Sequence, residues 1–187
     1  MAARNYGVIC KPLPHQEFLR ERISYDEYTG HLTWNTRPLY LFNSDRIGKG
    51  WNSKYAGKRI ANARNGYSEI QLDGCNYQVH RVIIKLLTGV DPEGIIDHID
   101  GDRSNNRLNN LRICTLQQNS FNQKKRNANA TGYKGVSIVK QTGRFHACIK
   151  HNYKTIHLGT FKTASMAHEA YKQAAINLFG EYANGTK

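Results

Sequence analysis

Alternating apolar and polar positions in the middle of the chain predict a β-hairpin that leads directly into a short helix. The alternation runs through residues 67–72, an Asp-Gly pair at 73–74 is a strong two-residue turn, and residues 75–79 can return as the partner strand. Residues 80–87 then place apolar side chains at helical spacing, and a Thr-Gly pair at 88–89 is a suitable helix end.

A second run of elements follows with the order strand, loop, strand and helix. The segment IIDHIDGD at 95–102 begins as a strand, an asparagine-rich loop comes next, and LRICT at 111–115 returns as a second strand. A polar stretch with helical character covers residues 116–125. Together these elements predict a ββα unit. Upstream, residues 28–30 are typical of a turn, whereas residues 36–53 are rich in turn residues and support no prediction.

The C-terminal third has the pattern of a separate βββα module. The basic segment KKRNANAT at 124–131 is nearly free of apolar residues and is typical of a linker. Beyond it, strands are expected at 133–140, 144–151 and 153–161, and a helix at 163–178. The buried face of that helix is expected to comprise Ala167, Ala170, Tyr171, Ala174, Ala175 and Leu178.

The charge balance points to a polyanionic partner. The 187 residues include 27 lysines and arginines against 14 acidic residues, which gives a net charge of +13. Such an excess favours nucleic acid. No apolar run is long enough to span a membrane, and residues 1–11 lack the layout of a secretory signal, so a soluble cytoplasmic protein is expected.

The four cysteines lack the spacing of a thiolate metal site. Cys10, Cys75, Cys114 and Cys148 form no CxxC pair, so they are expected to be reduced, mostly buried thiols.

A protein that hydrolyses the phosphodiester bonds of nucleic acid needs a base that takes a proton from water and a cation beside the phosphate. Hard divalent cations take oxygen ligands.

The IIDHIDGD strand, the asparagine-rich loop and the following helix resemble the signature of HNH (ββα-metal) endonucleases, especially the homing type, across residues 67–123. The resemblance implies that His98 is the general base and that Asp97 and Asn119 bind one divalent metal ion. Asn110 would fix the loop and orient His98. Because many members have histidine where Asn119 stands, oxygen ligands and Mg²⁺ (or Mn²⁺) are expected.

Each of these residues also has a plain structural explanation. Asp97, Asp100 and Asp102 could be turn formers, and asparagines suit any loop. His80 could cap the short helix. The arginines expected to contact phosphates in this part of the chain are Arg81, Arg103, Arg107 and Arg112, followed in the linker by Lys124, Lys125 and Arg126.

The C-terminal module resembles an APETALA2-type (AP2/ERF-like) DNA-binding domain. The resemblance rests on YKGV at 133–136, GRF at 143–145, HLGTF at 157–161 and the alanine-rich helix. In strand two, Phe145, Ala147 and Ile149 are expected to pack on the helix. The resemblance implies a DNA-contacting face made of Lys134, Ser137, Arg144, His146, Lys150, Thr155 and His157. A solvated basic sheet face is the alternative.

The sequence therefore predicts an α+β protein with three parts. An HNH endonuclease domain is expected at 1–123 with its ββα-metal core at 95–123, a linker at 124–131 and the AP2-like domain at 132–187. The expected function is hydrolysis of double-stranded DNA by a monomer without an obligate protein partner, with nicking slightly favoured over double-strand cleavage. The alternative is a non-catalytic, sequence-specific DNA-binding regulator. An RNA-binding protein is disfavoured, because no aromatic RNA-binding signature is present.

Overall fold

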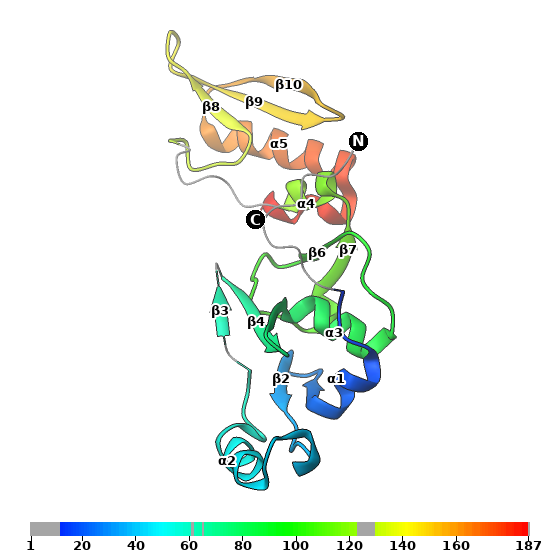
Figure 1. Cartoon of the computed structure of the whole chain (residues 1–187). Coiled ribbons are helices and arrows are strands. Elements are labelled where there is room, and N and C mark those ends of the chain that lie inside the picture. Colours follow the sequence, from blue (N-terminus) through cyan, green and yellow to red (C-terminus); the bar gives the residue numbers. More distant parts are fainter. Residues whose placement is uncertain (1–11, 61, 65, 123–129, 187) are drawn as a thin grey trace. The chain divides into compact units, whose positions relative to one another are not determined.

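The computed structural model describes residues 12–60, 62–64, 66–122 and 130–186. The contacts divide the chain into two compact units (Figure 1). Unit 1 comprises Met1–His98 and Asp102–Ile113, and unit 2 comprises Ile99–Gly101 and Cys114–Lys187. The boundary therefore falls inside the expected ββα segment, between its second strand and its helix. The predicted mixture of helices and small sheets is confirmed as an α+β fold.

Unit 1 contains short helices and three small sheets. Its elements are α1 (Gln16–Arg22), β1 (Ile23–Asp26), β2 (His31–Trp34), η1 (Leu39–Leu41), α2 (Asp45–Tyr55), β3 (Asn62–Arg64), β4 (Tyr67–Leu72), β5 (Cys75–Gln78), α3 (Val79–Thr88), β6 (Ile95–His98), η2 (Leu108–Asn110) and β7 (Leu111–Cys114). The sheets have the orders β1-β2, β3-β4-β5 and β6-β7. Apolar side chains from α1, β1, β2, β4 and α3 form one core. Helix α3, the element that precedes β6 in the chain, is part of this core.

The predicted hairpin and helix are confirmed. β4 pairs antiparallel with β5, and the turn residues Asp73 and Gly74 have φ values of 45° and 78°. Positive φ at both central residues is the requirement of a type I′ turn, which an Asp-Gly pair meets. Helix α3 ends at Gly89, whose φ of 76° makes it a left-handed C-cap.

Helix α2 lies in a region where the sequence supported no prediction. Its start is defined by Ser44, whose side chain accepts a hydrogen bond from the backbone N–H of Ile47 at 3.4 Å. Gly48 is buried on this helix. A larger residue would not fit there, because a Cβ would lie 2.7 Å from the ring of Phe42 and 2.8 Å from Leu39. Close packing at a glycine leaves no apolar period in the sequence, which explains why α2 was missed.

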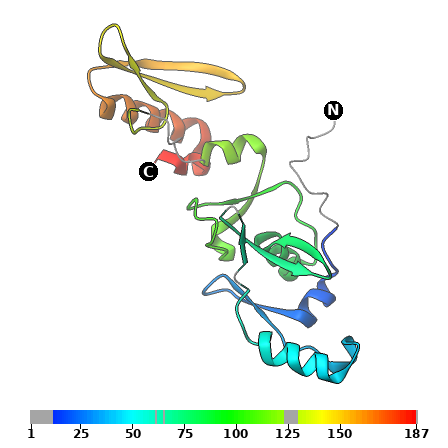
Figure 2. The ribbon, with the colours of Figure 1, turned by 60° about the vertical axis from the view of Figure 1, so that its left-hand side comes forward.

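Unit 2 is a three-stranded antiparallel sheet packed on a helix, together with one short helix from the expected ββα unit. Its elements are α4 (Leu116–Asn122), β8 (Val136–Val139), β9 (Arg144–His151), β10 (Lys154–Phe161), α5 (Ala164–Phe179) and η3 (Gly180–Thr186). The strand order is β10-β9-β8, and α5 covers one face of the sheet, as Figure 2 shows. Phe145, Ala147 and Ile149 of β9 pack inward as predicted.

Two details of this module differ from the prediction. The first strand begins at Val136 rather than at residue 133, because Gly135 turns the chain with φ 73° directly against the ring of Tyr171. On α5, Leu178 is 37% exposed, whereas Phe179 is buried. The helix therefore places its last large core side chain one position later than expected.

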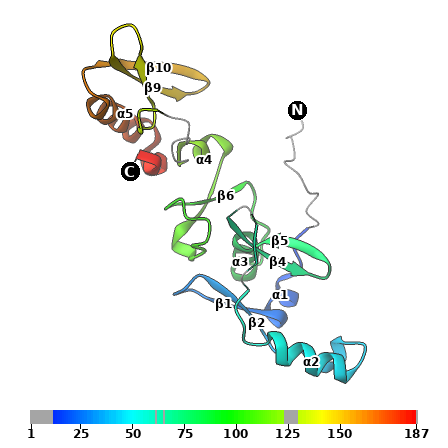
Figure 3. The ribbon, with the colours of Figure 1, turned by 90° about the vertical axis from the view of Figure 1, so that its left-hand side faces the viewer.

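Helix α4 packs against the C-terminal module (Figure 3). The rings of Phe121 and Phe179 stack with centroids 3.5 Å apart and an angle of 10° between their planes. The Nζ atom of Lys134 donates a hydrogen bond to the carbonyl of Phe121 at 2.7 Å, near the C-terminal end of α4. The helix predicted to complete the ββα unit thus belongs to the aromatic core of unit 2. Its expected assignment to the first domain stays a prediction.

Among the helices that the structure describes, none is long and apolar enough to cross a lipid bilayer.

Candidate active site

Asp97 and His98 are the last two residues of β6, and both side chains are buried. Asp97 is 7% exposed and His98 is 4% exposed. Adjacent strand residues point to opposite faces, so each side chain meets different neighbours. The chain turns immediately after His98 and reaches Gly101 with φ 71°. The chain therefore bends directly after this pair.

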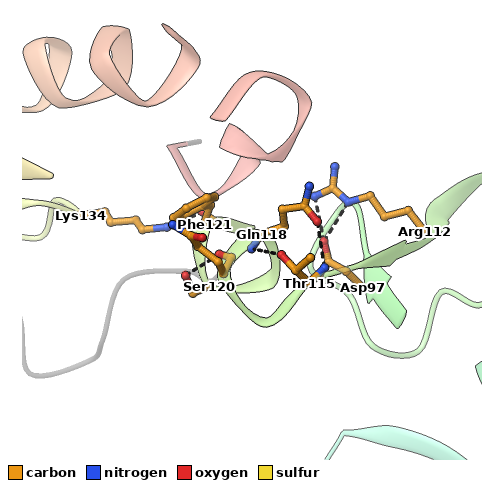
Figure 4. Close-up of polar contacts among 8 residues, drawn as sticks. Asp97, Arg112, Thr115, Gln118, Ser120, Phe121 and Lys134 are labelled. Carbon is orange, nitrogen blue, oxygen red and sulfur yellow. Dashed lines mark hydrogen bonds and ion pairs between the residues drawn. The ribbon is translucent and has the colours of Figure 1, made fainter. Parts of the chain in front are cut away.

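The Asp97 carboxylate is paired with Arg112 of β7 (Figure 4). The Nε and Nη2 atoms of Arg112 donate to Oδ2 of Asp97 at 3.0 and 2.8 Å, and the Arg112 side chain is 11% exposed. A buried charge is stable only when it is paired and hydrogen-bonded. Arg112 therefore compensates the charge of Asp97, which gives this guanidinium a role other than the predicted phosphate contact.

We expect Arg112→Ala to lower the free energy of unfolding by about 3–5 kcal/mol, because removing one partner of a buried ion pair leaves the other charge uncompensated. Urea denaturation followed by circular dichroism measures this change. Arg103→Ala is the matched control, because Arg103 is exposed and lies over the ring of Tyr67 at 4.6 Å. Equal stability of the two variants would contradict a structural role for the Asp97–Arg112 pair.

His98 is oriented by an asparagine that the motif did not single out. Its Nε2 lies 3.1 Å from Oδ1 of Asn106, a residue only 3% exposed. An amide oxygen only accepts hydrogen bonds, so Nε2 donates and Nδ1 is the basic nitrogen of the neutral ring. Asn110 donates to the carbonyl of Asn105 at 2.8 Å and so holds the loop next to Asn106. Asn106 could not be distinguished in the sequence, because it lies among several loop asparagines.

A second histidine and a tyrosine pack on His98. The ring centroids of His80 and His98 are 5.3 Å apart, and that of Tyr67 lies 6.0 Å from His98. Burial, with smaller effects from His98 and Arg81, lowers the pKa of His80 to about 3. His80 is therefore neutral at physiological pH. It lies within α3, which begins at Val79, so the alternative that it caps this helix is wrong.

Two other arginines that were predicted to contact phosphates, Arg81 and Arg107, form hydrogen bonds within the protein. Arg81 donates to the carbonyls of Pro92 at 2.7 Å and Gly94 at 3.1 Å, ahead of β6. Arg107 is exposed, and its Nε donates to the carbonyl of Tyr28. Arg81 thus supports the entry to β6. A phosphate contact by any of these side chains stays a prediction.

Asn119 lies on α4 in unit 2 and is half-buried. The start of α4 is a reciprocal cap: the backbone N–H of Thr115 donates to Oε1 of Gln118 at 2.8 Å, and the N–H of Gln118 lies 3.2 Å from Oγ1 of Thr115 (Figure 4). This cap and the Phe121 contact define the helix that carries Asn119. Its role as a metal ligand stays a prediction.

One face of the C-terminal sheet gathers most of the predicted DNA contacts. Strand register aligns Ser137 with His146, and Lys150 with Thr155. The imidazole rings of His146 and His157 lie 4.3 Å apart. The exposed members of this face are Ser137, Arg144, Lys150, Thr155 and His157.

The remaining predicted contacts lie elsewhere. Lys134 precedes β8 and donates to Phe121, and burial lowers its pKa to about 8. The ammonium group of Lys134 is therefore hydrogen-bonded to the carbonyl of Phe121 and does not form part of the sheet face. Lys124, Lys125 and Arg126 lie outside the described residues. Of the cysteines, Cys114 is buried, whereas Cys75 and Cys148 are half-buried thiols.

The donor chemistry of the predicted metal ligands fits a hard divalent ion. Within the described part of the chain, no group of three or more His, Cys, Asp or Glu side chains could hold a metal ion by itself. Asp97 and Asn119 offer a carboxylate and an amide oxygen. Mg²⁺ commonly binds one or two carboxylates and completes its shell with waters and substrate phosphates. These donors suit that mode and not a thiolate zinc site.

Comparison with known proteins identifies the family to which this segment is similar. Residues 77–121, which include Asp97, His98 and Asn110, match the family model described as HNH endonuclease. An uncharacterized HNH endonuclease of Acanthamoeba polyphaga mimivirus is 35% identical over 126 residues, which cover 66% of this chain and 64% of that protein. Protein 3.8 of Escherichia phage T7 is 33% identical over 82 residues, covering 41% of this chain and 68% of that protein.

The chain therefore carries an HNH endonuclease domain and belongs to this family. YosQ, an SPbeta prophage-derived protein of Bacillus subtilis whose name assigns it to the HNH homing endonucleases, is 36% identical over 61 residues, or 32% of this chain and 35% of that protein. The chain spans 64% of the length of the mimivirus relative. No solved structure matches the chain.

Proposed function

We propose that this protein is a metal-dependent endonuclease that hydrolyses phosphodiester bonds of double-stranded DNA. The observation that carries the proposal is the buried Asp97–His98 pair at the end of β6, in which each side chain has its own polar partner. Arg112 compensates the carboxylate and Asn106 orients the imidazole. Such support for adjacent polar residues is typical of a preorganised catalytic site.

In the proposed reaction His98 acts as the general base. Its basic nitrogen accepts a proton from water, the water oxygen bonds to phosphorus, and the bond from phosphorus to the 3′-oxygen breaks. Asp97 and Asn119 would hold the Mg²⁺ (or Mn²⁺) ion, which when bound supplies positive charge beside the phosphate and the leaving oxygen. Asn110 acts through the loop, because it fixes the backbone that precedes Asn106.

The C-terminal sheet is proposed to contact the DNA in the manner of an AP2-type domain. Its support is the exposed basic face with Arg144 and Lys150, on a segment with a large charge excess: residues 120–187 hold 11 basic and 2 acidic side chains. Phosphate contacts of this kind position a protein on DNA without specifying sequence. A homing-type enzyme that acts as a monomer and nicks one strand is the form we propose.

Incubation of supercoiled plasmid with the protein and Mg²⁺ tests the proposal. Nicked circles are the expected product, because one ββα unit acts on one strand at a time. Linear plasmid as the first product would replace nicking by double-strand cleavage. Binding without any cleavage, at several metal concentrations, would overturn the nuclease in favour of the DNA-binding regulator.

Asn119→Ala should raise the Mg²⁺ concentration needed for half-maximal cleavage, and excess Mn²⁺ should restore part of the activity, since Mn²⁺ binds a depleted ligand set better. EDTA should stop cleavage by the wild type. Ser120→Ala is the matched control, because Ser120 is exposed on the same helix and its hydroxyl donates to the Gln117 carbonyl. The double variant Asp97→Ala/Arg112→Ala should raise the Mg²⁺ requirement as Asn119→Ala does. Replacing both residues avoids leaving the Arg112 charge buried without its partner.

Cleavage that persists in EDTA would remove the metal from the mechanism. An unchanged Mg²⁺ requirement in Asn119→Ala would remove Asn119 from the ligand set.

A further inference from the structure

A cleft in unit 1 is lined by aromatic and basic side chains. Helix α2, which contributes to its lining, lies at the opposite end of this unit from β6 (Figures 1 and 3). The cleft has a volume of about 660 Å³ and lies between α2, the end of β2 and the β4–β5 turn. Both tryptophans of the chain, Trp34 and Trp51, line it. The proposed catalytic residues do not line it, so it requires a separate explanation.

Aromatic packing and backbone hydrogen bonds fix the walls of the cleft. The rings of Trp34 and Trp51 meet edge to face with centroids 5.6 Å apart. The backbone N–H of Trp34 donates to the carbonyl of Lys58 at 3.1 Å, and the N–H of Gly57 donates to the carbonyl of Trp34 at 2.8 Å. Backbone bonds in both directions hold the segment after α2 against β2. The basic side chains of this segment therefore project from a fixed backbone.

The guanidinium of Arg37 lies over both indole rings. Its guanidinium carbon lies 4.1 Å from the Trp51 ring centroid and 5.0 Å from that of Trp34. Asn52 clamps the Arg37 backbone with hydrogen bonds of 2.9 and 2.8 Å to its N–H and carbonyl. Because Arg37 already covers the indole faces, the cleft is suited to a sugar-phosphate backbone rather than to stacking a base.

The charge of the cleft is strongly positive. Lys54, Lys58 and Arg59 are exposed and join Arg37 there, against a single acidic side chain, Asp73. Among the ion pairs of the described residues, none involves these four basic side chains. Like charges that outnumber their acidic neighbours repel each other, and a polyanion relieves that repulsion.

We propose that this cleft is a further DNA-binding site, which holds the phosphate backbone through Lys54, Lys58 and Arg59. It lies outside the segment that matches the HNH family model and outside the C-terminal sheet. The inference shares DNA with the proposed function but does not depend on hydrolysis. A nuclease with this additional anchor would cover a longer stretch of duplex than the catalytic segment alone.

The two tryptophans make the site directly observable. Titration of the full chain with a duplex oligonucleotide in EDTA should change the tryptophan fluorescence, because every indole of the protein lines the cleft. Lys54→Gln/Lys58→Gln/Arg59→Gln should lose most of this change. For this triple variant, the magnitude of the slope of log affinity against log salt should decrease by about 0.9 for each phosphate that it no longer binds.

The matched control is Arg20→Gln/Arg46→Gln/Lys49→Gln, which removes the same charge from exposed positions of α1 and α2 outside the cleft. It should keep the fluorescence change and most of the salt slope. All replaced side chains are exposed, so both variants should fold, as circular dichroism will verify. Equal affinity and equal slope in the two variants would overturn the proposal.

Two further arms distinguish the ligand. A mononucleotide at millimolar concentration should not displace the duplex, and displacement would replace the backbone site by a nucleotide pocket. Fluorescence that does not respond to DNA would also overturn the proposal. None of these readouts involves cleavage, so a failure of the nuclease in the plasmid assay leaves the result unaffected.

Discussion

His98→Ala should lower the rate of DNA cleavage by about 10²- to 10⁴-fold, the usual effect of removing a general base, and leave DNA affinity nearly unchanged. The reason is geometric. His98 is 4% exposed and its Nε2 faces Asn106, so little of its side chain is available to contact the DNA surface, and in the proposed mechanism it acts on the attacking water. Single-turnover cleavage at saturating DNA measures the rate, and fluorescence anisotropy in EDTA measures the affinity.

Two variants separate the chemistry from the packing. His98→Asn retains a polar side chain in the buried site, so it should fold and still lack cleavage. In His98→Ala, added imidazole should restore part of the rate if the lost function is that of a base. Full activity of either purified variant would remove His98 from the mechanism. Asn106→Ala should cause a smaller loss, because the imidazole would remain but lose its orientation.

Local signals in the sequence predicted the elements around the site correctly. An Asp-Gly pair at 73–74 accounts for the hairpin, and Gly89 for the end of α3, because both positions need a positive φ that few residues adopt readily. The strand expected to begin in the segment 95–102 is β6, which carries Asp97 and His98.

Contacts between distant residues could not be predicted. Arg112 looked like any other surface arginine until β6 and β7 were brought together, where it pairs with Asp97. Asn106 lies in a loop whose composition gives equal weight to each asparagine. Helix α2 has a buried glycine where a periodic apolar residue would otherwise reveal it. In each case the decisive contact joins residues of two different segments, and the pattern within one segment does not contain it.

The packing of α4 changes what deletion of the C-terminal module should do. From the sequence, removal of residues 133–187 is expected to weaken DNA binding and leave some nicking at low salt, because the module looked like an independent anchor. In the structure, the aromatic partner of Phe121 is Phe179, and the donor to its carbonyl is Lys134. Deletion removes both, together with the core on which α4 packs.

We therefore expect the truncated chain to lose nicking even when the DNA concentration saturates binding, because Asn119 would lie on a helix that no longer has a packing partner. Isolated helices as short as α4, which has seven residues, are unstable in water. The salt slope should also fall, by about 0.9 for each phosphate that the truncated chain no longer binds. A plasmid assay across a range of protein and salt concentrations separates the loss of rate from the loss of affinity.

A point variant tests the same step without removing the basic sheet. Phe179→Ala should destabilise unit 2 by about 3–5 kcal/mol, the usual cost of truncating a buried phenylalanine, and raise the Mg²⁺ requirement as Asn119→Ala does. Phe179→Leu retains most of the apolar volume and should recover both properties in part. Leu178→Ala is the control, because this neighbouring side chain is 37% exposed. If the truncated chain nicks saturating DNA at the full-length rate, α4 does not need this core, and Asn119 cannot be the ligand that the core holds in place.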